Sequence, residues 1–174
     1  MKRIFVLAVA AIFAAGTAMA DTTVIDISGI FSNGFQGDPS NEVLNIDLGG
    51  EASIDSISYD VTIETIDLSW LEETSFQIDA DGGSTGVVSP GAGDDFSGTA
   101  TYAGAAPAGF SSSDGQLSIE FFEIDFDDNV NAADAQYLSG STITIDFTPS
   151  NAIPEPSTFG LIALAGLGLV RRRR

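Results

Sequence analysis

The stretch Ile57–Glu64, with the sequence ISYDVTIE, alternates apolar and polar side chains along its length. This period of two predicts a β-strand with one buried face and one face in solvent. The buried face would carry Ile57, Tyr59, Val61 and Ile63, and the solvent face would carry Asp60, Thr62 and Glu64.

The same alternation recurs nearer the C-terminus. Phe122, Ile124 and Phe126 alternate with Glu123, Asp125 and Asp127, and Ile143, Ile145 and Phe147 alternate with Thr142, Thr144, Asp146 and Thr148. Shorter candidate strands are Val24–Ser28, Glu42–Leu48, Phe76–Asp79, Gly86–Ser89 and Phe96–Tyr102. About eight strands separated by turn residues, with no long helix before residue 157, favour an all-β fold. Residues 21–150 are predicted to form an antiparallel β-sandwich, jelly-roll-like in type.

Cationic and acidic residues occupy different parts of the chain. Its 174 residues include 25 Asp and Glu, 6 Lys and Arg, and no His or Cys, for a formal net charge of -19. The cations are Lys2, Arg3 and Arg171–Arg174, whereas every carboxylate lies between Asp21 and Glu155. A body without cations cannot neutralise phosphates, which excludes nucleic-acid binding. Without His, Cys or Lys, the body also lacks the usual catalytic triads, a Schiff base, and imidazole or thiolate zinc ligands.

The N-terminal segment is typical of a secretory signal peptide. Two cations, Lys2 and Arg3, precede an apolar run over Ile4–Ala15, and Ala18 and Ala20 supply the small residues that signal peptidase requires. Residues 1–20 are therefore predicted to be removed, which leaves Asp21 at the start of the exported domain.

The C-terminal segment has three parts in a fixed order. Pro154, Glu155 and Pro156 come first, an uncharged apolar stretch over Phe159–Val170 follows, and the cluster Arg171, Arg172, Arg173 and Arg174 ends the chain. A helix over this stretch would be about 18 Å long, shorter than the hydrocarbon core of about 30 Å. The arginines would stay in the cytoplasm. We expect transient membrane insertion of a short helix rather than a permanent anchor.

This order of Pro-Glu-Pro, short apolar helix and Arg-rich tail resembles the PEP-CTERM sorting signal of Gram-negative bacteria, over residues 153–174. The resemblance implies export, recognition by an exosortase in the inner membrane, cleavage near Pro154–Pro156, and delivery to the cell surface or the extracellular space. It also implies association with bacteria that make extracellular polysaccharide, biofilm or floc.

Gly115–Phe147 resembles the last strand pair of jelly-roll domains in other exported PEP-CTERM proteins, and of a proprotein-convertase P domain. That likeness concerns the fold and implies no active site.

The densest group of oxygen ligands spans Glu123 to Asp134. Ca²⁺ prefers six to eight hard oxygen ligands, and a 12-residue loop offers them at alternating positions. The candidate ligands are Glu123, Asp125, Asp127, Asn129, Asn131 and Asp134. The loop departs from the EF-hand pattern, because Asp128 stands where Gly is usual and Asp134 ends the loop in place of Glu. The preferred interpretation is that Glu123, Asp125 and Asp127 form the solvent face of a strand. Cations would then bind loosely to the loop or elsewhere on the surface, rather than at a defined EF-hand-like site.

Trp70 is the only tryptophan. It could anchor the core or stack on a sugar ring, and a lone Trp in a β domain is more often a core residue.

Three function classes follow from these features. The preferred class is a non-catalytic exported surface or matrix protein whose partners are divalent cations and extracellular polysaccharide. The second is a carbohydrate-binding or Ca²⁺-binding module, with Trp70 as a candidate glycan contact. The third is a small glycoside hydrolase that uses a pair of carboxylates.

Overall fold

The computed structural model describes residues 19–125 and 132–150, and one compact unit spans Ala18–Asn151. In the described ranges there is no helix. The strands are β1 (Asp21–Asp26), β2 (Phe31–Ser32), β3 (Glu42–Asp47), β4 (Ala52–Thr65), β5 (Thr74–Ala80), β6 (Gly83–Ser84), β7 (Thr99–Ala106), β8 (Ser111–Ser112), β9 (Gln116–Glu123), β10 (Ala135–Tyr137) and β11 (Thr142–Pro149). The predicted all-β class is confirmed.

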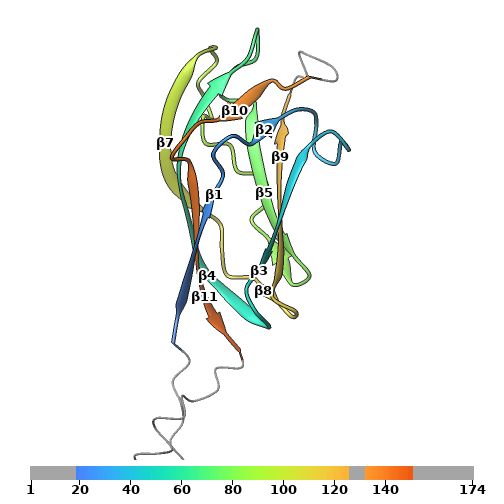
Figure 1. Cartoon of the computed structure of the whole chain (residues 1–174), viewed down its shortest axis with the longest axis vertical. Helices are drawn as coiled ribbons and strands as arrows, with labels where there is room; N and C mark the ends of the chain where they lie inside the picture. The colour runs from blue at the N-terminus through green and yellow to red at the C-terminus, as the bar shows by residue number, and fades with distance from the viewer. Residues whose placement is uncertain (1–18, 126–131, 151–174) are drawn as a thin grey trace, which may run out of the picture. The chain divides into compact units, whose positions relative to one another are not determined.

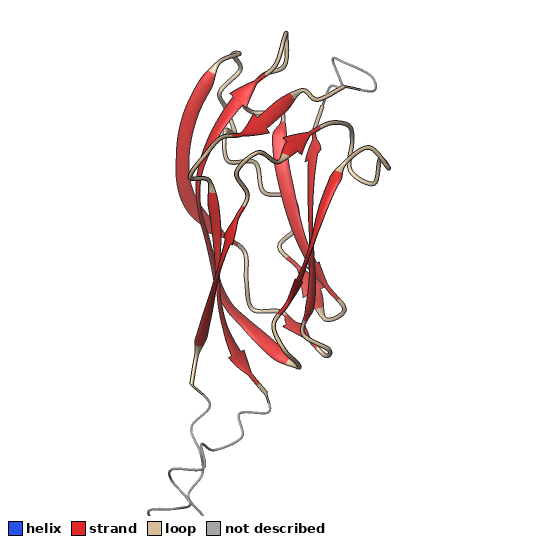
Figure 2. Ribbon diagram, viewed as in Figure 1, coloured by secondary structure: helices blue, strands red, loops and turns tan. Residues whose placement is uncertain are grey.

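The strands form two sheets that lie face to face (Figure 2). The seven-stranded sheet has the order β1-β11-β4-β10-β2, and the four-stranded sheet has the order β3-β9-β5-β6. In the larger sheet, β7 and β8 pair with the side of β4 opposite β11 (Figure 1). Every pairing between these strands is antiparallel, as the sequence predicts.

The long strand β4 organises the larger sheet because its apolar side chains point to one side. Ile57, Val61 and Ile63 are buried and Tyr59 is half-buried, as their alternation predicts. The alternation changes phase at a bulge: Ser56 pairs with Asp146, whereas Ile54 pairs with the next residue of β11. Asp55 is the extra residue of the bulge. Because of it, Ile54 before the bulge and Ile57 after it both lie on the buried face, although they are three residues apart.

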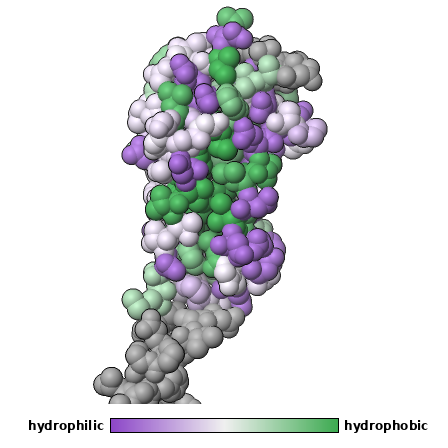
Figure 3. Space-filling model, viewed as in Figure 1, coloured by the Kyte–Doolittle hydropathy of each residue, from purple (hydrophilic) through white to green (hydrophobic). Residues whose placement is uncertain are grey.

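The core lies between the two sheets and takes side chains from both of them. Tyr59 of β4 meets Phe76 of β5 edge to face, with ring centroids 5.8 Å apart. Phe121 of β9 meets Tyr137 of β10 in the same way at 5.2 Å. Figure 3 shows hydrophobic side chains along the middle of the face in view, with hydrophilic ones on both flanks. Because the core residues belong to Ala18–Asn151, this unit has a hydrophobic core of its own.

Three predicted strands differ from the observed ones. Phe122, Ile124 and Phe126 are predicted to line a buried face, but β9 ends at Glu123 and its core-facing residues are Leu117, Ile119 and Phe121. Phe126 lies outside the described residues. The alternation had been placed one residue out of phase because Phe121 and Phe122 are both buried. Gly86–Ser89 forms only an isolated bridge, in which Val88 pairs with Phe76. The strand expected from Phe96 begins at Thr99, after Gly98, whose φ is 140°.

Candidate functional site

Three acidic side chains are buried where the ends of several strands meet. Glu73, Glu123 and Asp134 have exposed fractions of 3%, 1% and 1%, and we call them the buried acidic cluster. Glu123 is the last residue of β9, and Glu73 directly precedes β5, whose Thr74 pairs with Glu123. Asp134 directly precedes β10, and its N–H donates to the carbonyl of Ser32 at 2.9 Å. The fold thus brings together acids that are far apart in the sequence.

Glu73 has a local structural role in the cluster. Its carboxylate accepts hydrogen bonds from the Trp70 N–H at 2.8 Å and from the Ser69 hydroxyl at 3.3 Å. These bonds hold the turn that leads from β4 into β5. An acid in this turn is buried because it satisfies backbone and hydroxyl donors there.

Glu123 has a strongly altered acidity. Burial raises the pKa of its carboxyl from 4.5 to about 8, with further rises from the Asp134 and Glu73 carboxylates. The hydroxyls of Ser32 and Thr74 oppose the rise. In the described part of the chain, neither oxygen of Glu123 meets a donor in full hydrogen-bond geometry. Glu123 is therefore mostly protonated at neutral pH, when it would otherwise be an uncompensated buried charge.

The six predicted calcium ligands are only partly described. Asp127, Asn129 and Asn131 lie outside the described residues. Glu123 and Asp134 come together in the buried acidic cluster, whereas Asp125 is exposed and has a φ of 70°. In residues 19–125 and 132–150, no group of three or more acidic side chains is placed to hold a metal ion.

The expectation that Glu123 belongs to the solvent face of a strand is wrong. The chain at Gly34 and Phe35 lies beside the end of β9, where the Glu123 N–H donates to the Gly34 carbonyl at 2.9 Å and Phe35 forms a parallel bridge with Glu123. Counted by twos from Leu117, Ile119 and Phe121, Glu123 falls on the core-facing side of β9. There Ser32, Thr74 and Asp134 act on its carboxyl. The prediction failed because the alternation was counted from Phe122, one residue out of phase with the core-facing residues of β9.

Trp70 is 42% exposed, so its interpretation as a core residue is wrong. The neighbouring Leu71 is fully buried and takes the core position. The Leu71 N–H donates to the Phe96 carbonyl at 3.1 Å, which places the two segments side by side. Phe96 is 51% exposed and Leu68 is 76% exposed, so apolar side chains on both segments face solvent. This arrangement leaves the indole of Trp70 accessible to a ligand.

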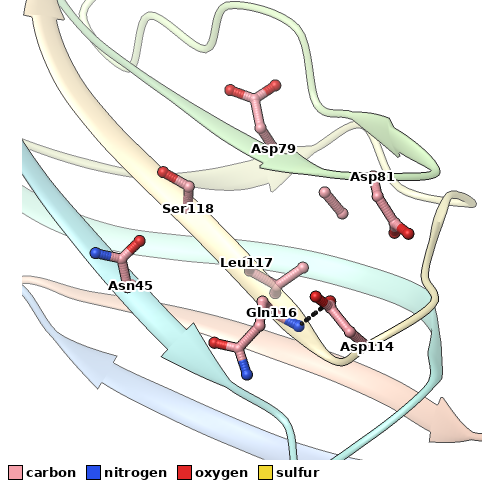
Figure 4. A pocket seen from close by; sticks show the side chains of 8 residues that line it. Asn45, Asp79, Asp81, Asp114, Gln116, Leu117 and Ser118 are labelled. Atoms are coloured by element: carbon pink, nitrogen blue, oxygen red, sulfur yellow. Dashed lines mark hydrogen bonds between the residues drawn. The ribbon is translucent and has the colours of Figure 1, made fainter.

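A cavity of about 260 Å³ opens on the four-stranded sheet near the β5–β6 turn (Figure 4). Its walls include the carboxylates of Asp79, Asp81 and Asp114 and the amides of Asn45 and Gln116. The Gln116 N–H donates to Asp114 at 2.9 Å, and the Ser113 N–H donates to Asp81 at 2.9 Å. The Ser113 hydroxyl and N–H lower the pKa of Asp81.

The cavity is therefore an acidic, hydrogen-bonding surface without a cationic group. Its lining side chains come from β3, β5, β9 and the turns beside them, so they are adjacent only after folding. Sequence reasoning missed the cavity for this reason, and it missed Glu73 because its place beside Glu123 depends on the strand register.

The terminal signals lie almost wholly outside the described residues. Among the predicted cleavage residues, Ala20 is described and exposed, and Ala18 is not described. β1 begins at Asp21, so cleavage after Ala20 would leave every strand intact. Within the described ranges, no helix is long and apolar enough to cross a membrane. Pro154, Glu155, Pro156, Arg171–Arg174 and the predicted C-terminal helix are outside those ranges.

Comparison with known families identifies the C-terminal segment. Residues 152–174 match the model of the PEP-CTERM protein-sorting motif. The chain therefore carries the C-terminal exosortase sorting signal, as its resemblance implied. This motif indicates an exosortase-sorted exported protein that passes through the membrane to a cell-surface or extracellular destination.

Comparisons of the whole chain give weaker similarities. No curated protein matches the chain. Among solved structures, the chain is similar to the crystal structure of dimeric latent PorU from Porphyromonas gingivalis, with a TM-score of 0.40 and 9% identity. That match covers 78% of this chain and 14% of the other.

Proposed function

We propose that the exported domain is a non-catalytic surface or matrix protein, associated with biofilm or exopolysaccharide. The observation that carries the proposal is the combination of a sorting motif at residues 152–174 with a body that bears carboxylates and no Lys, Arg or His. Among the described acidic side chains, only the buried acidic cluster is removed from solvent. The delivered surface is thus densely anionic.

The fold that presents this surface is a jelly-roll sandwich. Support comes from the strand order, in which β1-β11-β4-β7 form one layer and β3-β9-β5-β6 form the other. The chain passes from one layer to the other between β1 and β3, between β3 and β4, and between β4 and β5. Such crossings are typical of a double-sheet jelly roll. An N-terminal signal peptide and a short C-terminal membrane helix complete the proposed precursor.

Divalent cations are the proposed small partners of the domain. Carboxylates at the surface accept hydrogen bonds from hydroxyl groups. The Asp146 carboxylate accepts from the Thr22 and Ser56 hydroxyls, each at 2.7 Å. The Ser40 hydroxyl likewise donates to Asp38 at 2.6 Å. These hydroxyls lower the pKa of Asp146 and Asp38 without neutralising their charge. The uncompensated negative charge favours Ca²⁺, which binds oxygen ligands. We propose loose cation binding over these surface carboxylates, and the loop with Glu123, Asp125, Asp127, Asn129, Asn131 and Asp134 stays the less favoured alternative for a defined site.

The absence of catalysis is part of the proposal. The body has no His, Cys or Lys to act as a base or nucleophile. Carboxylates alone could still support glycoside hydrolysis. In the cavity, however, the hydroxyl and N–H of Ser113 lower the pKa of Asp81, which favours its charged form over the protonated form that a general acid needs.

Calcium titration and polymer binding test the proposal. Isothermal titration of the domain with CaCl₂ should show binding, and the domain should co-sediment with the extracellular polysaccharide of its host in the presence of Ca²⁺. EDTA should release the polymer. Hydrolysis of that polysaccharide by the purified domain would contradict the proposal, and so would an absence of both Ca²⁺ and polymer binding.

A second candidate function is direct carbohydrate binding, favoured by the 42% exposure of Trp70. An exposed indole offers an apolar face to a sugar ring, and carboxylates nearby accept hydrogen bonds from sugar hydroxyls. A glycan array should then show binding that Trp70→Ala abolishes and that EDTA leaves intact. Val43→Ala, which also removes an exposed apolar side chain, is the matched control. Equal binding by both variants would reject this candidate.

A further inference from the structure

The outer edges of the two sheets differ in how they are protected against pairing with another strand. A strand edge with free backbone groups is a template for pairing, and proteins block it with charged residues, Pro or very short strands. At the edge of the larger sheet, β1 carries Asp21 and Asp26, and in the smaller sheet β3 carries Glu42 and Asp47. The remaining edge strands β2, β6 and β8 have two residues each.

The edge formed by β7 has none of these protections. β7 is eight residues long, and its sequence TATYAGAA contains no charged residue and no Pro. The uncharged stretch continues on both sides, because no charged residue lies between Asp95 and Asp114. In the described part of the chain, β7 pairs only with β4, and it forms the outermost strand of its layer in Figure 1.

The hydrogen bonds of β4 show which backbone groups of β7 are free. The Thr62 N–H donates to the Ser141 hydroxyl at 3.0 Å and its carbonyl accepts from the Leu138 N–H at 2.8 Å, so Thr62 faces away from β7. Alternate residues direct their backbone groups to opposite sides. Ile63 and Val61 therefore face β7, where their partners are Ala100 and Tyr102.

The backbone groups of the other β7 residues consequently point away from the sheet. These residues are Thr99, Thr101, Ala103 and Ala105. All four are exposed, and their side chains are small. The free edge is thus an uncharged row of N–H and C=O groups that another backbone can approach closely.

We propose that β7 pairs antiparallel with β7 of a second copy of this chain and joins two larger sheets into one. Charge selects the site, and the self-complementarity of identical strands selects the partner. Two copies repel each other wherever their carboxylates meet, and the β7 edge is the long sheet edge without them. A pairing of identical strands is self-complementary, as a two-fold dimer requires. The inference goes beyond the proposed function and does not depend on cation or polysaccharide binding.

The test compares the wild-type domain Ala18–Asn151 with Ala105→Glu, which adds negative charge to the edges that would pair. Within one chain Ala105 lies opposite Ser58 of β4, so the new carboxylate does not face another one inside the sheet, as it would opposite Asp60 at Ala103. Sedimentation velocity from about 10 µM to about 1 mM should show a monomer–dimer equilibrium for the wild type. Screening by about 0.3 M NaCl should strengthen the dimer, because it weakens repulsion between carboxylates. Ala105→Glu should weaken dimerisation at least tenfold, a magnitude of about 1.4 kcal/mol.

Val24→Glu is the matched control, because it adds the same charge to the β1 edge at a side chain that is 63% exposed. It should leave the dimer unchanged. Circular dichroism confirms folding, and Thr101→Glu, opposite Thr62 of β4, replaces Ala105→Glu if the latter unfolds the domain. A wild type that stays monomeric over the whole range would overturn the inference, and so would equal weakening by Val24→Glu and the β7 variants.

Discussion

Replacing Glu123 with Gln should remove a large part of the pH dependence of the domain's stability. The pKa of this carboxyl is about 8 in the fold and 4.5 as the ordinary value. The folded and ordinary pKa values differ by about 3.5. At about 1.36 kcal/mol for each pKa unit, this difference corresponds to about 5 kcal/mol in the free energy of unfolding. Because the neighbouring acids titrate together with Glu123, we expect a measured effect of about 3–5 kcal/mol.

The sign follows from which state holds the proton more tightly. The folded pKa is the higher one, so protonated Glu123 stabilises the fold relative to the unfolded chain. This contribution is fully present below pH 4.5 and is lost as the pH rises through about 8. The wild type should therefore lose about 3–5 kcal/mol more than Glu123→Gln between these two limits. Gln has nearly the same shape and remains neutral.

Urea unfolding, followed by the emission of the single Trp70, measures the free energy of unfolding at each pH. Urea is preferred over guanidinium because it does not screen charge, and EDTA removes adventitious cations. Glu64→Gln, which removes an exposed carboxylate from β4, is the control and should follow the wild type. Parallel pH profiles for the wild type and Glu123→Gln, within about 1 kcal/mol, would refute the assignment of a destabilising buried charge to Glu123.

Three further predictions concern the core, a tight turn and the surface charge. Val61→Ala should lower the free energy of unfolding by about 2–3 kcal/mol in urea, whereas Val24→Ala should change it by less than about 0.5 kcal/mol, because only Val61 is buried. Gly115→Ala should cost more than Gly49→Ala in the same assay: both glycines have a left-handed φ, but only at Gly115 would the new Cβ meet the backbone of Gly50. About 0.3 M NaCl or millimolar Ca²⁺ should raise the melting temperature in calorimetry, because both weaken repulsion among the carboxylates, and an unchanged melting temperature would count against this reasoning.

The fold class could be predicted because strand alternation is a local property. Ile57, Val61 and Ile63 are buried as expected, and so are Ile143 and Ile145. The alternation failed in β9, where Phe121 and Phe122 are both buried and the phase could be counted from either residue. Glu123 shares the core-facing side of β9 with Leu117, Ile119 and Phe121, so counting from Phe122 put it on the wrong face.

Contacts that depend on strand register could not be predicted either. Glu73 and Asp134 reach Glu123 only through the ends of β5 and β10, and the cavity takes its acids from different strands and turns. Trp70 shows a related limit. Which of Trp70 and Leu71 enters the core is decided by the turn between β4 and β5, where Glu73 binds the Trp70 N–H. The C-terminal sorting motif was predictable because its parts are contiguous in the sequence.

Intact-mass spectrometry of the protein from its native host tests most directly that this is an exported domain flanked by two removable signals. The expected polypeptide begins at Asp21 and lacks the segment beyond Pro154, Glu155 and Pro156, with or without an added lipid or glycan mass. Recovery of a chain that retains both Met1 and Arg174 would contradict the account.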